Sequence, residues 1–149
     1  MEFDFLVPID NEIIDYKNHL SSQHIGGVMA LHTDDAFPDL SEVKIALVGV
    51  LENRGDEGVA TVVDLTSVRK SLYGLFMGNW KMGIADLGDI LAGNSTMDTY
   101  FAVKKVVASL IKKGIVPIVI GGSQDLTYAL YRAYDELEQM VNLVAIDNK

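Results

Sequence analysis

Uncharged, mostly apolar runs of the chain alternate with segments whose apolar side chains recur at helical spacing. The runs occupy residues 45–50, 115–120 and 141–146. Such runs are typical of strands that are buried on both faces of a parallel sheet. Helical spacing occupies residues 59–75, 95–114 and 126–137. This order predicts right-handed βαβ crossovers and an α/β fold, a three-layer α/β/α sandwich around a mainly parallel sheet.

The clearest predicted helix is the segment 95–114. Ser95 and Asp98 have the form of a capping box, and Gly114 is placed to end the helix. Four lysines of this segment are interpreted as a solvated helix face rather than a binding patch. In the following run, Pro117 removes one backbone donor and indicates a strand start or an interruption there.

The first 43 residues lack this regularity and are interpreted as an irregular lead-in packed on the domain. A short helix is expected at residues 11–20 and a loop at residues 26–38. Residues 44–149 form the predicted α/β domain. Because the chain stops where its third predicted strand leaves the sheet, we expect it to be the N-terminal part of a longer domain.

Composition narrows the functional classes. The chain has 149 residues, 49% hydrophobic and 22% charged, which predicts one folded domain. The absence of cysteine excludes disulfides and cysteine-based metal sites. The net charge of −9 arises within residues 1–60, so nucleic-acid binding is not expected. The sequence shows no secretion signal and no apolar run long enough to span a membrane, which predicts a soluble, cytoplasmic protein.

Two motifs follow the second and third predicted strands. Pro117-Ile118-Val119-Ile120 runs into Gly121-Gly122-Ser123-Gln124-Asp125-Leu126-Thr127, and the third strand runs into Asp147-Asn148-Lys149. The arrangement resembles the ureohydrolases, the family of arginase, agmatinase and formimidoylglutamase. In that family P-I-V-L precedes G-G-D-H-S-L-T, and the following strand ends in D-A-H-x-D. The Arg54-Gly55 loop, the segment around Arg69 and Asp86-Leu87-Gly88-Asp89 also follow in the family's order.

The resemblance implies a pair of manganese ions, held by the His of G-G-D-H-S and by the Asp, His and Asp of D-A-H-x-D. Gln124 and Lys149 stand at the two histidines, and only Asp147 of the first three ligands matches. A lysine ammonium has no lone pair to offer a metal, and glutamine offers only a neutral carbonyl oxygen. We therefore expect no cofactor in this chain. Asp147, Lys149 and Gln124 would instead hold the strand ends together by an ion pair and hydrogen bonds.

The strand-end residues also have a simpler interpretation. Gln124 is then an ordinary residue of a first helical turn, Ser123 or Asp125 is an N-cap, and Lys149 is a frayed terminus. Gly121 and Gly122 precede a predicted helix, where an anion can bind, but no nucleotide-binding motif accompanies them.

Other candidate groups rank lower. His19, His24 and His32 are five and eight residues apart, and unconnected side chains are preferred over a metal cluster. Arg54-Gly55-Asp56 is interpreted as a turn. Asp86 and Asp89 are interpreted as loop residues that bond backbone groups, in preference to a catalytic pair.

Two functional hypotheses follow from the resemblance. The first is a family member that has lost its manganese site and acts as a binding or assembly module. The second is a hydrolase of a guanidino or formimino C–N bond, with ligands beyond residue 149 and a small guanidino or formimino compound as its partner. An uncovered sheet edge or face after the third predicted strand would also lead the chain to self-associate.

Overall fold

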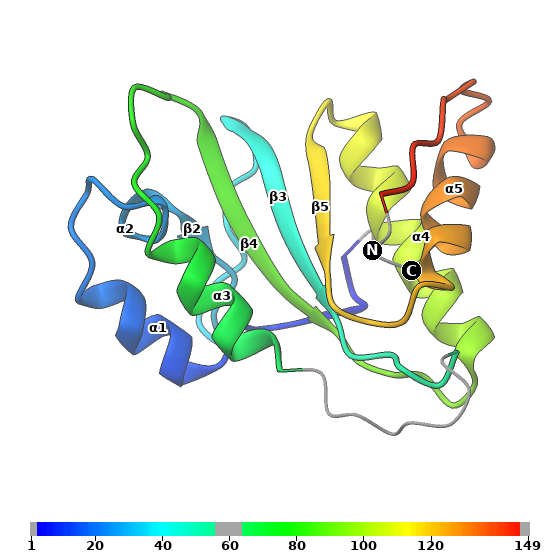
Figure 1. Cartoon of the computed structure of the whole chain (residues 1–149), viewed down its shortest axis with the longest axis horizontal. Helices are drawn as coiled ribbons and strands as arrows, with labels where there is room; N and C mark the ends of the chain where they lie inside the picture. The colour runs from blue at the N-terminus through cyan, green and yellow to red at the C-terminus, as the bar shows by residue number, and fades with distance from the viewer. Residues whose placement is uncertain (1–2, 56–63, 147–149) are drawn as a thin grey trace.

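The computed structural model, which describes residues 3–55 and 64–146, is built on a mainly parallel sheet (Figure 1). Strand β3 (Val43–Val50) lies between β4 (Gly83–Ile90) and β5 (Val116–Ile120), and both neighbours run parallel to it. Two short strands, β1 (Leu6–Val7) and β2 (Ala30–Leu31), pair with the other side of β4. Strand β5 therefore has one strand neighbour, β3, within the described residues.

Helices cover both faces of this sheet, which confirms the predicted three-layer α/β/α architecture. Helices α1 (Asn11–Asn18), α2 (Ile25–Val28) and α3 (Leu65–Tyr73) lie on one side, and α4 (Thr96–Lys112) and α5 (Leu126–Glu136) on the other (Figure 1). Strand β3 alternates accordingly, because Val48 packs with the core under α4 and α5 whereas Leu47 packs with the core under α1–α3.

Local signals explain where most helices begin and end. Ser95 and Asp98 form the predicted capping box of α4, and Gly114 follows that helix with a φ of 72°. Helix α3 begins at Leu65, where the Asp64 side chain accepts a hydrogen bond from the Ser67 N–H. The prediction placed a helix at residues 59–75, and α3 occupies Leu65–Tyr73 of that segment. Residues 59–63 lie outside the described residues.

Two segments that were expected to be loops form regular structure. Asp86 and Asp89, which were interpreted as loop residues, lie in strand β4, where Asp86 is fully buried, and the expected loop at residues 26–38 contains part of α2 and all of β2. A carboxylate within an apolar run argues against a buried strand unless a cation partners it. Arg69 on α3 is that partner, and it lies 17 residues away in the sequence.

The predicted third strand at residues 141–146 is wrong. This segment forms no strand, and Leu143, Val144 and Ile146 are exposed. An apolar run becomes a buried strand only where it gains a strand neighbour and cover on both faces. The segment has no strand neighbour among the described residues. No helix in the described part of the chain has both the length and the apolar character needed to cross a bilayer.

Candidate functional site

The candidate site lies where β3, β4 and β5 end and three loops meet, at the bottom of Figure 1. We call residues 51–55, 91–94 and 121–125 the strand-end loops. The Ser123 N–H donates to the Glu52 carbonyl at 3.0 Å. Arg54 donates from Nη2 to the Gly93 carbonyl at 2.8 Å and from Nη1 to the Asn94 carbonyl at 3.1 Å. The three loops are therefore joined by hydrogen bonds, at the end of the sheet where α/β proteins bind ligands.

Glu52 is the central charged group of the strand-end loops. Its carboxylate is fully buried and accepts hydrogen bonds from Arg54 Nε at 2.9 Å, from Arg54 Nη2 at 2.5 Å and from Thr99 Oγ1 at 2.8 Å. Hydrogen bonds from Arg54 outweigh the effect of burial and lower the pKa of Glu52 to about 2. The carboxylate is thus charged at neutral pH and held by the protein's own donors.

The motif residues after β5 adopt a tight turn into α5. Gly121 and Gly122 have φ angles of 85° and 77°, in the region that favours glycine. A Cβ at Gly122 would also meet the Leu126 side chain. Ser123 is buried, whereas Gln124 is exposed and lies in the turn before α5, ahead of the N-cap Asp125, rather than in the first helical turn.

Asp125 occupies the N-cap position of α5, but its side chain makes no capping hydrogen bond. Its Oδ2 atom instead accepts from the Tyr100 hydroxyl of α4, and the carboxylate packs against Gly55. The Asp125 Oδ1 and Ser123 Oγ atoms are buried and have no hydrogen-bond partner among the residues that the structure describes.

Of the three predicted metal-site positions, the structure describes one. Gln124 is described, but Asp147 and Lys149 lie outside the described residues, and so does Asp56 of the predicted Arg54-Gly55-Asp56 turn. Their predicted cluster stays a prediction. The described residues contain no group of three or more His, Cys, Asp and Glu side chains that could hold a metal ion.

The three histidines have separate partners. His19 Nδ1 lies 2.7 Å from the Asp15 carbonyl oxygen, and the His24 ring stacks on Phe76 with centroids 4.6 Å apart. His32 Nδ1 lies 2.9 Å from the Leu87 carbonyl oxygen.

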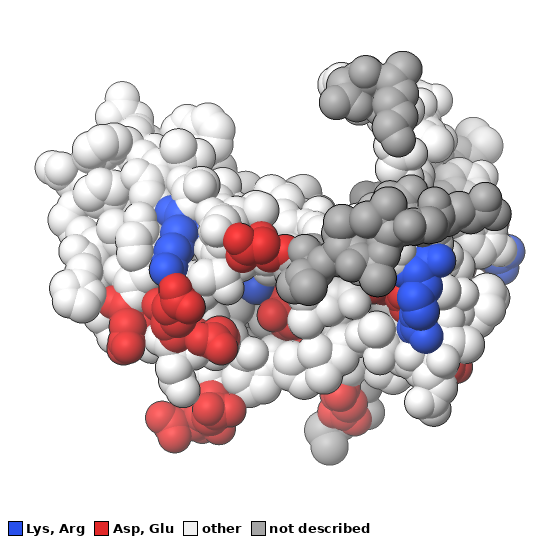
Figure 2. Space-filling model, turned by 60° about the horizontal axis from the view of Figure 1, so that its bottom comes forward, with Lys and Arg blue, Asp and Glu red and all other residues white. Residues whose placement is uncertain are grey.

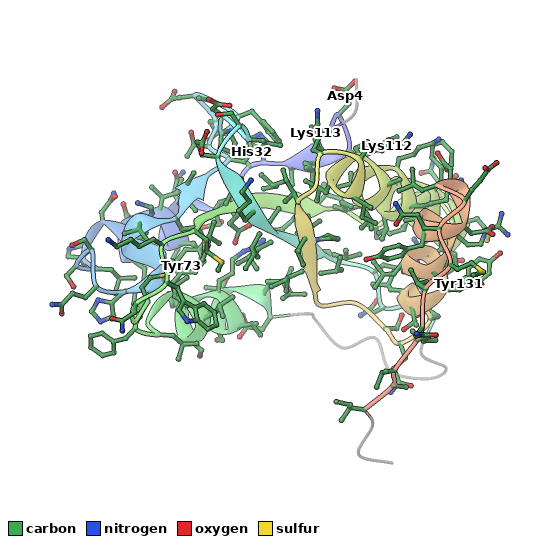
Figure 3. All side chains as sticks on the ribbon, turned by 90° about the horizontal axis from the view of Figure 1, so that it is seen from above. Asp4, His32, Tyr73, Lys112, Lys113 and Tyr131 are labelled. Atoms are coloured by element: carbon green, nitrogen blue, oxygen red, sulfur yellow. The ribbon has the colours of Figure 1, made fainter. Side chains whose placement is uncertain are left out.

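A second polar cluster, which the sequence did not predict, lies between α3 and β4. Buried Asp86 accepts from Arg69 Nε at 2.8 Å, from the Tyr73 hydroxyl at 2.8 Å and from the Gly88 N–H at 3.1 Å. Arg69 Nη2 lies 2.7 Å from Asp89 Oδ1. Burial and the charge of Asp86 raise the pKa of Tyr73, which therefore stays protonated as a donor. We call Arg69, Tyr73, Asp86 and Asp89 the Arg69 cluster; Figure 3 labels Tyr73.

The acids near the strand ends differ in whether an arginine already pairs with them, and this determines which of them could bind a metal ion. Figure 2 shows this end of the molecule with acidic side chains at several places. Glu52 is held by Arg54, while Asp86 and Asp89 are held by Arg69. Asp125, Ser123 and Gln124 offer one carboxylate, one hydroxyl and one amide. The family resemblance implies a manganese pair held by histidines and several aspartates, and residues 51–55, 91–94 and 121–125 contain no histidine. The described donors therefore do not fit such a pair.

The sequence carried weak signals for the residues that were missed. Glu52 directly follows an apolar strand, and Arg69 and Tyr73 are four residues apart on one helix. A charged residue beside a buried strand indicates that an opposite charge or a hydrogen-bond donor lies near it. The sequence does not show which residue that is. Thr99 lies 47 residues from Glu52.

Comparisons with known proteins agree with this architecture. The model of the Arginase family matches residues 61–148. No curated protein matches the chain. An arginase superfamily protein from Trypanosoma cruzi has a similar structure, with a TM-score of 0.55 and 20% identity over 67% of this chain and 40% of that chain.

Two further solved structures share the fold. Agmatine ureohydrolase of Thermoplasma volcanium has a TM-score of 0.54 and 21% identity, over 80% of this chain and 41% of that one. Formimidoylglutamase from Bacillus subtilis has a TM-score of 0.55 and 16% identity, over 86% and 45%. The chain thus spans less than half the length of these structures, and at this identity the likeness concerns the fold.

Proposed function

The chain belongs to the arginase family, and we propose that it is a member without a manganese site, which acts as a binding or assembly module rather than as a hydrolase. The observation that carries the proposal is Gln124, which follows β5 where the family resemblance calls for a metal-binding histidine. Gln124 supplies a neutral amide oxygen in place of the imidazole nitrogen that the resemblance implies, so this ligand of the implied set is missing. A cytoplasmic location is part of the same proposal.

The charges of the strand-end loops support this proposal. Glu52 is neutralised by Arg54, and Thr99 donates to its second oxygen. A metal ion that recruited Glu52 would have to displace the hydrogen bonds that the partly exposed Arg54 guanidinium donates to this buried carboxylate, which costs free energy. We infer that Glu52 and Arg54 hold the loops in place and do not bind metal.

The second candidate function is hydrolysis of a guanidino or formimino C–N bond. The fold shared with agmatine ureohydrolase and formimidoylglutamase favours it. This alternative needs ligands beyond residue 149 and a replacement for the histidine at position 124.

Metal binding and hydrolysis separate the two candidates. Purified chain is stripped with chelator, mixed with excess manganese and dialysed, and its manganese is then measured by elemental analysis. We expect no stoichiometric manganese, and no urea or formamide release from arginine, agmatine or formimidoylglutamate. One or two tightly held ions per chain, or product release that is lost in Asp147→Asn, would establish the hydrolase instead.

A double variant provides the matched control for the ligand argument. Gln124→His with Lys149→His restores imidazoles at both family positions. Manganese retention by this variant, but not by the unchanged chain, would assign the missing metal to these two substitutions.

A further inference from the structure

We propose that two copies of this chain assemble by reciprocal strand exchange, in which residues 141–146 of each copy add as a strand to the free edge of β5 in the other. We call residues 141–146 the donor segment and the unpaired side of β5 the acceptor edge. The inference rests on the assembly part of the proposed function and names the surface that would carry it. It does not depend on the metal site.

The acceptor edge is both unpaired and apolar. Among the described strands β5 pairs with β3 alone, and its Val116 and Ile118 side chains are 59% and 40% exposed. Ile118 also lines an apolar groove of about 580 Å³ beside the sheet. Other groove residues come from α2, α3, β3, β4 and the loop before β4: Ile25, Met29, Ile45, Leu47, Leu72, Leu75, Phe76, Met77, Gly78, Trp80 and Ile84. An edge of this kind is a template for strand addition.

The donor segment has the composition of a strand but no strand partner. It carries no charge and no proline, and it is rich in β-branched and aliphatic residues. Leu143, Val144 and Ile146 are 67%, 80% and 97% exposed. Figure 3 shows the chain after α5 running away from the sheet. Within the described part of the chain, one molecule therefore presents a donor and an acceptor that both lack a strand partner, which is the condition for exchange between copies.

Pro117 favours the donor segment over a second β5 as the occupant of the acceptor edge. Proline has no N–H to give to a ladder. Antiparallel pairing of two β5 strands would place both copies' Pro117 in one joint. The donor segment has six residues and no proline, so each joint contains only the acceptor's Pro117.

The apolar area available is in the range that a dimer needs. The exposed parts of Val116, Ile118, Leu143, Val144 and Ile146, with those of Phe76 and Trp80, give roughly 400–700 Å² for each joint at the usual area per side chain. Two reciprocal joints then bury roughly 800–1,400 Å², which overlaps the lower part of the 1,200–2,000 Å² or so of stable interfaces.

Three matched valine substitutions test the proposal in the 149-residue chain. Val144→Lys alters the donor segment and Val116→Lys alters the acceptor edge. Val68→Lys is the control, because Val68 is 47% exposed on α3, outside both surfaces. Sedimentation or light scattering across a dilution series gives the dimer dissociation constant, and circular dichroism verifies folding.

At physiological ionic strength, where long-range repulsion is screened, we expect the unchanged chain and Val68→Lys to dimerise alike, and each of the other two variants to dimerise at least about tenfold more weakly. A mixture of Val144→Lys with Val116→Lys should recover dimers, because each mixed dimer retains one unaltered joint. Amides of residues 141–146 should gain protection from hydrogen exchange as concentration rises.

Other results would overturn the inference. A monomer at every concentration excludes the dimer. Dimerisation that resists Val144→Lys but not Val116→Lys indicates pairing between β5 edges, and protection of the donor segment that is independent of concentration indicates pairing within one chain. Manganese-dependent hydrolysis would refute the proposed function while leaving these measurements intact, so the two failures are distinguishable.

Discussion

Each fully buried acid in residues 3–55 and 64–146 has an arginine within ion-pair distance, and that pairing favours its charged state. Glu52 lies against Arg54, and Asp86 lies against Arg69. Taking one carboxylate out of water is costly, and its partner and hydrogen bonds offset that cost only while both remain in place. Replacing one carboxylate by an amide at these positions should therefore lower the free energy of unfolding more than the same replacement at an exposed acid.

Glu52→Gln should weaken the dependence of stability on pH. The folded pKa of Glu52 is lowered from 4.5 to about 2, so its stabilisation is present above pH 4.5 and is lost as the pH falls toward 2. At neutral pH we expect the variant to lose about 1.5–3 kcal/mol of unfolding free energy, the range for a charged hydrogen bond. Urea unfolding measured from neutral to acidic pH gives the free energy of unfolding of both proteins, and the difference between them should become smaller as the pH falls. Substitution of the exposed Glu42 by Gln should change this free energy little at any pH.

Asp86→Asn should be more damaging, because it removes a charge from the buried Arg69 cluster. Arg69 would keep Asp89 but lose the carboxylate that accepts from its Nε atom. Breaking a buried pair costs about 3–5 kcal/mol. Thermal and urea unfolding measure the loss, with exposed Asp15→Asn as the control. If both variants lost the same free energy of unfolding, the ion pair of Asp86 with Arg69 would contribute nothing to stability.

At the scale of elements, predictions from sequence succeed where one local signal is sufficient. The apolar runs that became β3 and β5 have no competing polar residue, and the capping box and Gly114 marked the ends of α4. Strand β4 was missed because Asp86 and Asp89 interrupt its apolar pattern and find their cation on α3. The opposite error occurred at residues 141–146, where an apolar pattern is present but a strand neighbour is not.

The same limit applies to the candidate site. The turn Gly121-Gly122 was correctly placed between a strand and a helix, because positive φ angles and a following helix are local properties. The contacts of Arg54 with Glu52, Gly93 and Asn94 depend on how three loops meet. The spacing of residues within one loop does not indicate which residues of the other two loops it contacts.

The N-terminus of α4 supplies a prediction at this scale. Ser95→Ala removes the oxygen that accepts from the Asp98 N–H and is expected to cost about 0.5–2 kcal/mol. Met97→Ala, in the same first turn and exposed, is the control and should stay within about 0.5 kcal/mol. Hydrogen exchange should show faster opening of the first turn of α4 in the serine variant only. Equal exchange in both variants would contradict a capping role.

At the scale of the whole molecule, charge and apolar surface act in opposite directions on assembly. The chain has a net charge of −9, and all of it arises in residues 1–60, where 12 acids face 3 bases. Strand β5 and the donor segment carry no charge. Two copies therefore repel at long range while their proposed contact surfaces attract at short range.

This opposition predicts that salt strengthens the proposed dimer. Raising sodium chloride from low to physiological ionic strength shortens the screening length to about 8 Å and weakens the repulsion between copies, while the apolar joint is unaffected. The dissociation constant measured by sedimentation should therefore fall as salt rises. Val68→Lys, which reduces the net negative charge outside both surfaces, should shift association in the same direction at low salt and lose that effect at high salt. Weaker association with added salt would show instead that ion pairs hold the copies together, and would exclude an uncharged strand joint as the main contact.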